Sequence, residues 1–313
     1  MTQPKPRSPS LTAHLLLLAV VLVWGTTFTL VKSALAHTTP LLFNLLRMAL
    51  AFVALLCVNA PGLRGLSRRD IRLGALTGLF LALGYQLQTA GLARTTPTKS
   101  AFLTGLVVVI VPLLSAIPGV SPAGTLKPTL DTYLGALLAL AGLLLLTDPG
   151  GTGWAIFSGL GYGELLSLAC AFAYAAHLLM LARAAPVVSA RRLGTLQIGF
   201  AALVMLFTLP LGGYPILHSV SVLWIALGVT AILATAAAFT IQSWAQQHLP
   251  ASHTALIFTL EPVFAWLTSL LFFGERLGLR AMLGAGLILA GILLAELRPT
   301  SRAGSGLLPL TGA

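Results

Sequence analysis

The side chain with the clearest chemical potential is Glu261, which lies beside Pro262 in the middle of a long apolar run, residues 251–273. An ionisable residue at the centre of a membrane helix costs about 2.5–3.5 kcal/mol on insertion scales, which makes it a candidate functional residue. The proline removes a backbone donor, and such breaks are tolerated where they are buried in protein or line a watery cavity. A carboxylate there could take up and release a proton during a conformational cycle. Alternatively, it stays protonated and only caps a broken helix.

A second candidate, Arg47, lies inside the apolar segment 40–60. Seven residues into a helix correspond to a depth of about 10 Å at 1.5 Å per residue, too far for the side chain to reach the surface easily. Glu261 or Glu164 could pair with the guanidinium, or the guanidinium could bind a substrate carboxylate. Lys32 and Glu164 fall near helix ends, where long side chains snorkel. A gate shared by these two residues is a further option.

A third group of candidates combines aromatic and amide side chains that fall at mid-helix: Trp24, Tyr174, Tyr85, Gln88 and Gln242. Aromatic and amide groups suit a site for small amphipathic solutes. The alternative is that they fill seams between helices. His177 could take part in proton transfer, although a lone histidine is more often a packing residue.

The composition requires these candidates to be positioned by membrane helices. The chain has 313 residues, of which 57% are hydrophobic and 8% charged, and soluble domains average about 25% charged residues. Its mean hydropathy is +0.96. We therefore expect an all-α integral membrane protein. Cys57 and Cys170 each lie in an apolar run, so we expect no disulfide framework and no metal site or cofactor.

Ten apolar segments have the length of about 20 residues that crosses a bilayer. They are residues 11–35, 40–60, 71–92, 98–120, 130–147, 160–182, 191–211, 220–246, 251–273 and 277–297. This divides the chain into a cytoplasmic head (1–10), a first five-helix unit (11–147), an external linker (148–159), a second unit (160–297) and a disordered cytoplasmic tail (298–313).

The distribution of basic residues predicts the orientation. With the N-terminus in the cytoplasm, twelve lysines and arginines fall on the inner face and five on the outer face. Membrane proteins carry an excess of these residues on the cytoplasmic side, so both termini are expected there. The net charge of +11 therefore indicates membrane topology, and no nucleic-acid partner is expected, because the bases lie between apolar runs.

The two halves of the chain repeat each other. Trp24 matches Tyr174 at a spacing of 150 residues (174 − 24), and Gln88 matches Gln242 at 154 (242 − 88). Five helices is an odd number, so the second copy enters the membrane from the opposite side. Inverted repeats are characteristic of secondary transporters, whose substrate site lies near the midplane between the copies.

The segments 134–145 and 283–294 also match, reading LGALLALAGLLL and LGAGLILAGILL. Within them, Gly135 with Ala139 and Gly286 with Ala290 have the small-xxx-small spacing that lets membrane helices approach closely. We expect both pairs to lie at helix contacts.

The chain resembles the EamA permeases of the drug/metabolite transporter (DMT) superfamily over residues 11–297. The matching stretches are WGTTFTLVKSAL from Trp24, FNLLRMALA from Phe43, TTPTKSAFLTGLVVVIVPLL from Thr95 and ALIFTLEPVFAWLTSLLFFGERL from Ala255. The resemblance implies a ten-helix inverted repeat in a bacterial cytoplasmic membrane, usually exporting small organic solutes. Members often end the fourth helix with an acidic residue like Glu275, and here that place reads SAIPGVSPAGTLKP, which puts a paired gating role in doubt.

The sequence thus predicts a transporter, with no enzymatic activity, that exports a small metabolite, an amino acid or a drug-like compound by alternating access. Protons are a candidate coupling ion, and the oligomeric state, monomer or homodimer, stays open. A phosphosugar or nucleotide-sugar exchanger is the alternative carrier, but it would need several bases in the cavity. A passive channel and an intramembrane enzyme acting on lipid are alternatives of other classes.

Overall fold

A computed structural model describes residues 9–117, 119, 129–147, 160–249, 254, 257, 258 and 260–297. Every element of this part is helical apart from one isolated β-bridge between Thr38 and Leu217, which agrees with the all-α prediction. Residues 1–8 of the predicted head, the predicted linker from 148 to 159 and the predicted tail from 298 lie outside the described residues.

Outside the segment 220–246, the α-helices of the described residues are α1 (Pro9–Ala34), α2 (Pro40–Asn59), α3 (Arg68–Leu92), α4 (Pro97–Gly105), α5 (Val107–Ser115), α6 (Leu130–Thr147), α7 (Tyr162–Ala184), α8 (Ala190–Thr208), α12 (Glu261–Phe273) and α13 (Leu279–Leu297). The predicted segment 220–246 is built from α9 (Ser221–Ala231), a π-helical turn η3 (Ile232–Ala237) and α10 (Ala238–Ala245). Two short 3-10 turns, η1 (Ala60–Leu63) and η2 (Leu209–Gly212), extend α2 and α8.

Six helical stretches of the described part are long and apolar enough to cross a bilayer. They are Leu11–Ala34, Pro40–Leu63, Pro97–Ser115, Tyr162–Ala184, Ala190–Gly212 and Ser221–Ala245. Two shorter apolar helices, Glu261–Phe273 and Leu279–Gly291, accompany them. The chain is therefore a membrane protein with several apolar helices.

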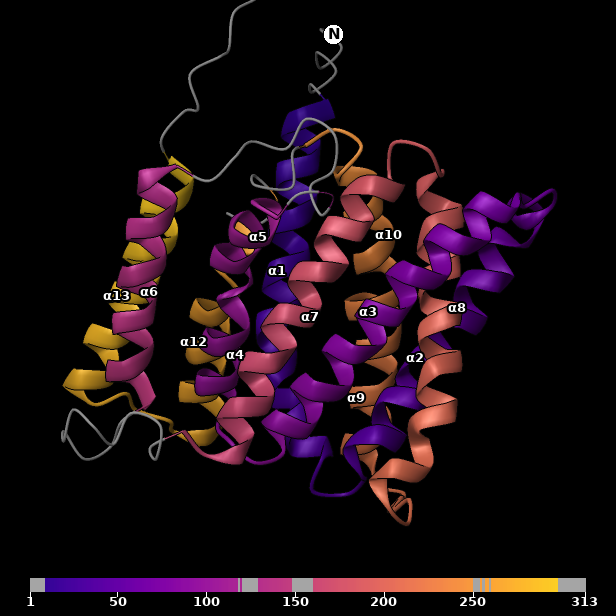
Figure 1. The fold of residues 1–313 in the computed structure, drawn as a ribbon. Coiled ribbons are helices and arrows are strands. Elements are labelled where there is room, and N and C mark those ends of the chain that lie inside the picture. Colours follow the sequence, from indigo (N-terminus) through magenta and orange to yellow (C-terminus); the bar gives the residue numbers. More distant parts are fainter. Residues whose placement is uncertain are drawn as a thin grey trace, which may run out of the picture.

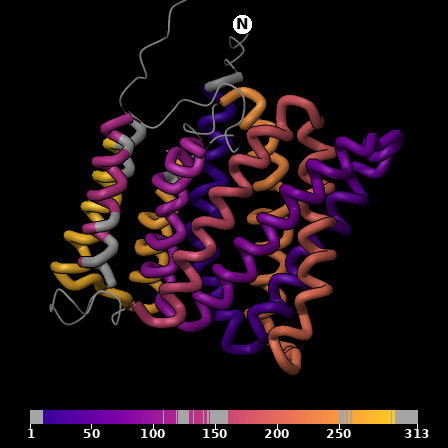
Figure 2. Tube along the Cα trace, in the orientation of Figure 1, coloured from indigo at the N-terminus to yellow at the C-terminus, as the bar shows by residue number. Residues whose placement is uncertain are grey.

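The helices form one elongated bundle with a separate pair at its side. Figure 1 shows α6 and α13 packed together at the left, with α1, α4, α5, α7 and α12 in the middle and α2, α3, α8, α9 and α10 at the right. The colours of Figure 2 show that each of these groups mixes early and late parts of the chain, so helices from the two halves are interleaved.

The α6–α13 pair is held by a reciprocal contact between glycines. A Cβ built on Gly142 would lie 2.5 Å from the carbonyl oxygen of Gly284, and one on Gly291 would lie 2.4 Å from the carbonyl oxygen of Gly135. Gly135, near the start of α6, therefore faces Gly291, near the end of α13, and Gly142 faces Gly284 in the same way. The two helices are antiparallel. Gly135 and Ala139 are at the contact as predicted, with Ala139 only 1% exposed.

The expectation for Gly286 and Ala290 is wrong, because both residues are exposed and a Cβ on Gly286 would meet nothing within 4 Å. The helix is rotated so that Gly284, Ile288 and Gly291 face α6 instead. A single sequence shows small-residue spacing but does not show which of two overlapping small-residue rows faces the partner.

Gly291→Leu is expected to destabilise the protein by about 1–3 kcal/mol or more, because the added side chain meets backbone atoms of α6 that cannot rotate away. Gly286→Leu adds the same side chain to the open side of the same helix and serves as the control. The measurement is the thermal transition of the purified variants in detergent. Equal stability of the two variants would contradict the observed contact.

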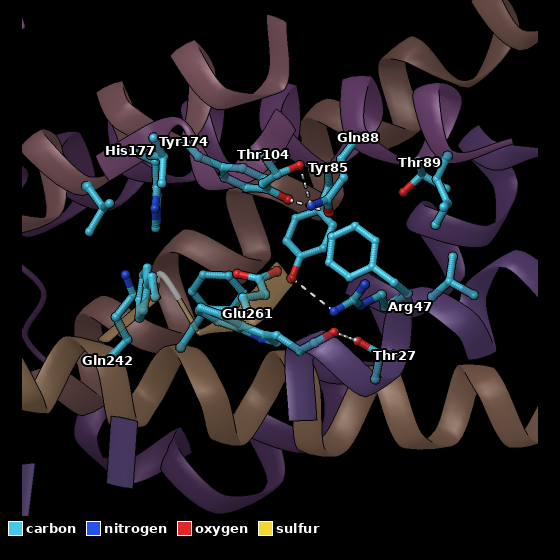
Figure 3. Close-up of a pocket in the computed structure, with 18 residues that line it drawn as sticks. Thr27, Arg47, Tyr85, Gln88, Thr89, Thr104, Tyr174, His177, Gln242 and Glu261 are labelled. Atoms are coloured by element: carbon cyan, nitrogen blue, oxygen red, sulfur yellow. Dashed lines mark hydrogen bonds between the residues drawn. The ribbon is translucent and has the colours of Figure 1, made fainter. Parts of the chain in front are cut away.

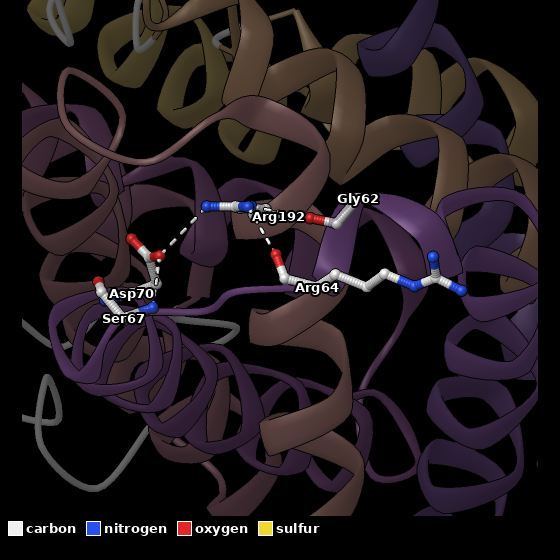
Figure 4. A network of polar contacts seen from close by, with 5 residues as sticks. All are labelled: Gly62, Arg64, Ser67, Asp70 and Arg192. Carbon is white, nitrogen blue, oxygen red and sulfur yellow. Dashed lines mark hydrogen bonds and ion pairs between the residues drawn. The ribbon is translucent and has the colours of Figure 1, made fainter.

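A polar network fixes the loop between α2 and α3 against the start of α8 (Figure 4). The side chain of Ser67 and that of Asp70 cap the N-terminus of α3 in a reciprocal capping box. Arg192 donates hydrogen bonds to the carbonyl oxygens of Gly62, at 2.8 Å, and Arg64, at 2.9 Å, and pairs with Asp70 at 3.5 Å. The network ties α8 to α3, which contributes Tyr85 and Gln88 to the site described next.

Candidate functional site

One cavity lies in the middle of the bundle, and the structure brings all eight predicted site residues to its wall (Figure 3). The eight are Trp24, Arg47, Tyr85, Gln88, Tyr174, His177, Gln242 and Glu261. They come from α1, α2, α3, α7, α10 and α12. The sequence had placed them on separate segments, so their convergence depends on the packing of both halves.

Further lining residues were not singled out from the sequence, among them Thr27, Phe28, Thr89, Thr104, Phe239 and Phe258. The repeat contained a signal for two of them, since Thr27 occupies the place of His177 and Phe239 that of Tyr85. The cavity volume is about 70 Å³. A buried water needs about 10–15 Å³ of such volume, so this state has room for a few waters and no bulky solute.

The cavity lies at the meeting of two helix breaks. Leu106 is a turn between α4 and α5, and Leu260, its match in the repeat, is a turn directly before α12. A Cβ built on Gly105 would lie 3.2 Å from Cγ of Pro262, so the two breaks pack against each other. The sequence predicted irregular backbone at Pro262, but nothing in it singled out the break at Leu106.

Glu261 opens α12, where the positive end of the helix dipole favours a negative charge. Gly25 lets α1 come close to this place, because a Cβ there would lie 2.8 Å from the carbonyl oxygen of Glu261. Within the described residues, the Glu261 carboxylate has no hydrogen bond or ion pair. Its position at the cavity wall leaves it available to a proton or to a bound solute.

Arg47 has different partners from those that we expected. Its Nε donates to the hydroxyl of Thr235 at 2.7 Å, and its Nη2 donates to the hydroxyl of Tyr85 at 2.9 Å and the carbonyl oxygen of Ala234 at 3.2 Å. The guanidinium also lies 4.4 Å from the centre of the Tyr85 ring. The predicted ion pair with Glu261 or Glu164 is therefore wrong.

The partners of Arg47 come from the π-helical turn η3, which the sequence did not reveal. A π-helical turn changes the local hydrogen-bond register and leaves backbone groups for other partners. The carbonyl oxygen of Ala234 accepts from Arg47 and also from the indole Nε1 of Trp24, at 2.8 Å. This one carbonyl therefore connects α1, α2 and η3 at the cavity wall.

The aromatic residues form two matching pairs across the repeat. Tyr85 and Tyr174 are in edge contact with ring centroids 5.7 Å apart, and their counterparts Phe239 and Trp24 lie 5.4 Å apart. Phe258 adds an edge contact to Trp24 at 5.1 Å. The sequence left open whether these rings line a binding site or fill the contacts between helices. They do both, because they line the cavity and also contact one another across helices.

The two matching amides differ in their bonding. Gln88 accepts a hydrogen bond from the hydroxyl of Tyr174 at 3.0 Å and donates to Thr104 at 3.4 Å. Gln242 is 1% exposed, and its Oε1 has no hydrogen-bond partner in the described part of the chain. His177 has a hydrogen bond of 2.9 Å between its Nε2 and Oε1 of Gln197, the residue that matches Arg47 in the repeat.

Lys32 and Glu164 both bind the turn between α3 and α4, outside the cavity. Lys32 donates to three carbonyl oxygens, those of Leu92 at 2.8 Å, Ala93 at 3.2 Å and Thr95 at 2.8 Å. Glu164 is 8% exposed, accepts from the hydroxyl of Thr95 at 2.7 Å and pairs with Lys99 at 3.6 Å. Glu164 therefore does not snorkel. The two side chains share Thr95 as a partner, and a gate made by them stays a prediction.

Glu275 completes this end of the molecule, although its family counterpart in the first half is absent. Its carboxylate accepts hydrogen bonds from the hydroxyls of Thr98, at 2.7 Å, and Ser269. Together with Lys32 and Glu164, it holds α4 against α1, α7 and α12. The stretch 115–128, where the sequence departs from the family pattern, is described only as far as residue 117 and at residue 119.

Comparisons with known proteins point to one family. A model of the EamA-like transporter family matches residues 11–148 and 161–297. An uncharacterized transporter from Archaeoglobus fulgidus is 31% identical over 288 residues, which is 91% of this chain and 86% of that protein. A solved crystal structure has the same fold with a TM-score of 0.64 at 21% sequence identity, and the match covers 91% of this chain and 96% of that one.

Proposed function

Since the chain belongs to the EamA-like transporter family, we propose that it is a secondary carrier that exports small organic metabolites by alternating access. The observation that carries this proposal is the central cavity, lined by residues of both halves and bordered by the paired helix breaks at Leu106 and Leu260. Transporters place their substrate at discontinuous helices near the midplane between repeats. Amino acids and drug-like solutes are the substrate classes that fit its aromatic and amide wall.

The proposed architecture has ten membrane segments in two inverted five-helix units, residues 11–147 and 160–297. The antiparallel α6–α13 contact supports it, because Gly142 and Gly291 occupy matching positions and make matching contacts. The matching aromatic pairs at Tyr85 and Phe239 support it as well. In an alternating-access cycle the two units rock around the cavity, and the small volume of this state requires such a movement before a solute enters.

The network at Thr95 gives this movement a candidate outer gate. Lys32, Glu164 and Glu275 bind residues of the α3–α4 turn and the start of α4, so opening that end requires these bonds to separate. Because they are hydrogen bonds between polar groups at a helix end, water can replace them in the open state.

A phosphosugar or nucleotide-sugar exchanger has less support. Such substrates carry two or more negative charges and need several basic side chains. Among the described residues that line the cavity, Arg47 is the one lysine or arginine, and two of its three nitrogens already donate to protein acceptors.

The test is release from proteoliposomes loaded with a bacterial metabolite extract, analysed by mass spectrometry against liposomes without protein. The carrier proposal predicts selective loss of one compound class that saturates with concentration. Loss of every compound below a size limit would indicate a channel instead. Chemical conversion of a solute or lipid would favour the enzyme alternative.

The proposed location is a bacterial cytoplasmic membrane with both termini in the cytoplasm. A reporter enzyme fused behind residue 313 is expected to be active only as a cytoplasmic fusion, because the basic residues favour that side. Moving the same reporter into the predicted outer segment 148–159 provides the control and should give periplasmic activity. Periplasmic activity of the C-terminal fusion would overturn the orientation.

A further inference from the structure

Two acceptors on one side of the cavity, in the side chains of Gln242 and Glu261, have no hydrogen-bond partner among the described residues. Figure 3 places Gln242 and Glu261 in its left half, with Arg47 at the right. The carbonyl oxygen of Gln242 is buried without a hydrogen bond, although a buried polar group without a partner costs about 1–3 kcal/mol. The carboxylate of Glu261 likewise has no partner within the described residues. A ligand with hydrogen-bond donors, bound in the cavity, would satisfy both groups.

The contrast with the first half makes this side distinctive. Gln88 stands at the matching position of the repeat, and both ends of its amide are bonded to Tyr174 and Thr104. At the place of Glu261 the first half has Val107. In the first half, the amide at the first of these positions has its hydrogen bonds and the residue at the second is apolar. In the second half, the amide oxygen and the carboxylate at the same positions have no partner among the described residues.

The rings beside these acceptors suit a positive charge. Trp24, Phe239 and Phe258 line the same cavity and contact one another, with Trp24 at 5.4 Å and 5.1 Å from the other two. The face of an aromatic ring, tryptophan above all, attracts a cation. Arg47 donates to Tyr85, Thr235 and Ala234, and the indole of Trp24 donates to the same carbonyl oxygen of Ala234.

We infer that Glu261 and Gln242, with the rings of Trp24, Phe239 and Phe258, form a subsite for a protonated amine carried by the substrate. The inference rests on the proposed carrier function and deepens it. An ammonium group has three N–H donors and no acceptor, so it can bind the carboxylate and the amide oxygen at once. Arg47 repels a second cation, which orients the amine toward Glu261.

The test uses three probes of similar size: 2-phenylethylamine, the neutral 2-phenylethanol and the anionic 3-phenylpropanoate. Binding to the full chain in lipid nanodiscs is measured by calorimetry, with no gradient across a membrane. We expect the amine to bind more tightly than both other probes. Equal or tighter binding of the alcohol or the carboxylate would overturn the subsite.

Two variants locate the binding. Glu261→Gln is expected to weaken amine binding by about tenfold or more, since a hydrogen bond to a charged group contributes at least this much. Gln242→Leu should weaken it severalfold and breaks no hydrogen bond recorded in the structure, so it keeps the test valid if the first variant folds poorly. Asp70→Asn, which changes a buried carboxylate outside the cavity and outside the candidate gate, is the matched control and should bind the amine normally.

Unchanged amine affinity in Glu261→Gln and in Gln242→Leu would disprove the subsite. The result is separable from the carrier proposal because binding needs no transport. If the protein binds the amine in this way but moves no solute in proteoliposomes, the subsite is supported and the proposed carrier function is contradicted. If the protein transports solutes but its amine binding does not depend on Glu261, the carrier function is supported and the subsite is contradicted.

Discussion

Glu261→Gln is expected to abolish the proton dependence of transport while the protein still folds. The amide has almost the same shape as the carboxyl group but cannot exchange a proton, so any cycle step that requires protonation at the first turn of α12 stops. The fold should persist because Glu261 makes no hydrogen bond or ion pair that the described residues record. The measurement is the initial rate of substrate transport in proteoliposomes over a range of imposed pH gradients.

Asp70→Asn provides the matched control for this prediction, since Asp70 is a buried carboxylate that binds Ser67 and Arg192 away from the cavity and the candidate gate. It should retain the pH response of the wild type. If transport by the Glu261→Gln variant responds to the pH gradient as strongly as the wild type does, Glu261 has no role in proton coupling. Its role would then be structural, at the start of a broken helix.

Arg47→Ala is expected to lower both stability and transport, and by more than Arg47→Lys. The alanine leaves the hydroxyls of Thr235 and Tyr85 without their donor, and a lost hydrogen bond to a charged group costs about 1.5–3 kcal/mol. Removal of a buried charge offsets part of this cost. A lysine keeps the charge and can bond one or two of the same acceptors, but it lacks the planar fork of the guanidinium.

The thermal transition and the transport rate of each Arg47 variant check this expectation. Arg94→Ala is the control for the loss of a charge, because Arg94 is an exposed arginine that donates to the carbonyl oxygen of Ala90 at 2.9 Å and lies 5.4 Å from the centre of the Tyr162 ring. Wild-type stability and transport in Arg47→Ala would exclude a structural role and a substrate-binding role alike.

The repeat in the sequence identifies several of the residues that line the cavity. Trp24 and Tyr174 match each other, as do Gln88 and Gln242, and in an inverted repeat matched residues at mid-helix lie near the same axis. Glu261 was found for a different reason, since a carboxylate in an apolar run is costly wherever it lies. All of these residues do line one cavity.

The contacts within the cavity could not be found in this way. The π-helical turn that supplies Ala234 and Thr235 to Arg47 lies in an apolar run, ILATAA, without a proline or other local marker. The break at Leu106 depends on its packing against Pro262 from the other half, and the orientation of α13 depends on Gly291 fitting against Gly135. Each of these features depends on contacts between two helices that are far apart in the chain. A single sequence does not show which helices are in contact.

The proposed inverted repeat makes the two halves equivalent in architecture, but their charged residues differ. Glu261 matches Val107, and Arg47 matches Gln197, so each half contributes one charged residue that the other lacks. A symmetric scaffold can present equivalent pathways to the two sides of the membrane, whereas unpaired charges give the cavity distinct ends. This combination is what a carrier needs to bind one class of solute in one orientation.

Counterflow in proteoliposomes tests the central claim most directly. Vesicles containing the protein are loaded with a high concentration of the unlabelled substrate found in the metabolite screen, and uptake of a trace of labelled substrate is followed without any ion gradient. A carrier with one alternating site predicts a transient accumulation of label above its equilibrium level. Monotonic equilibration of the label, with no overshoot, would contradict alternating access and indicate a passive pathway through the cavity.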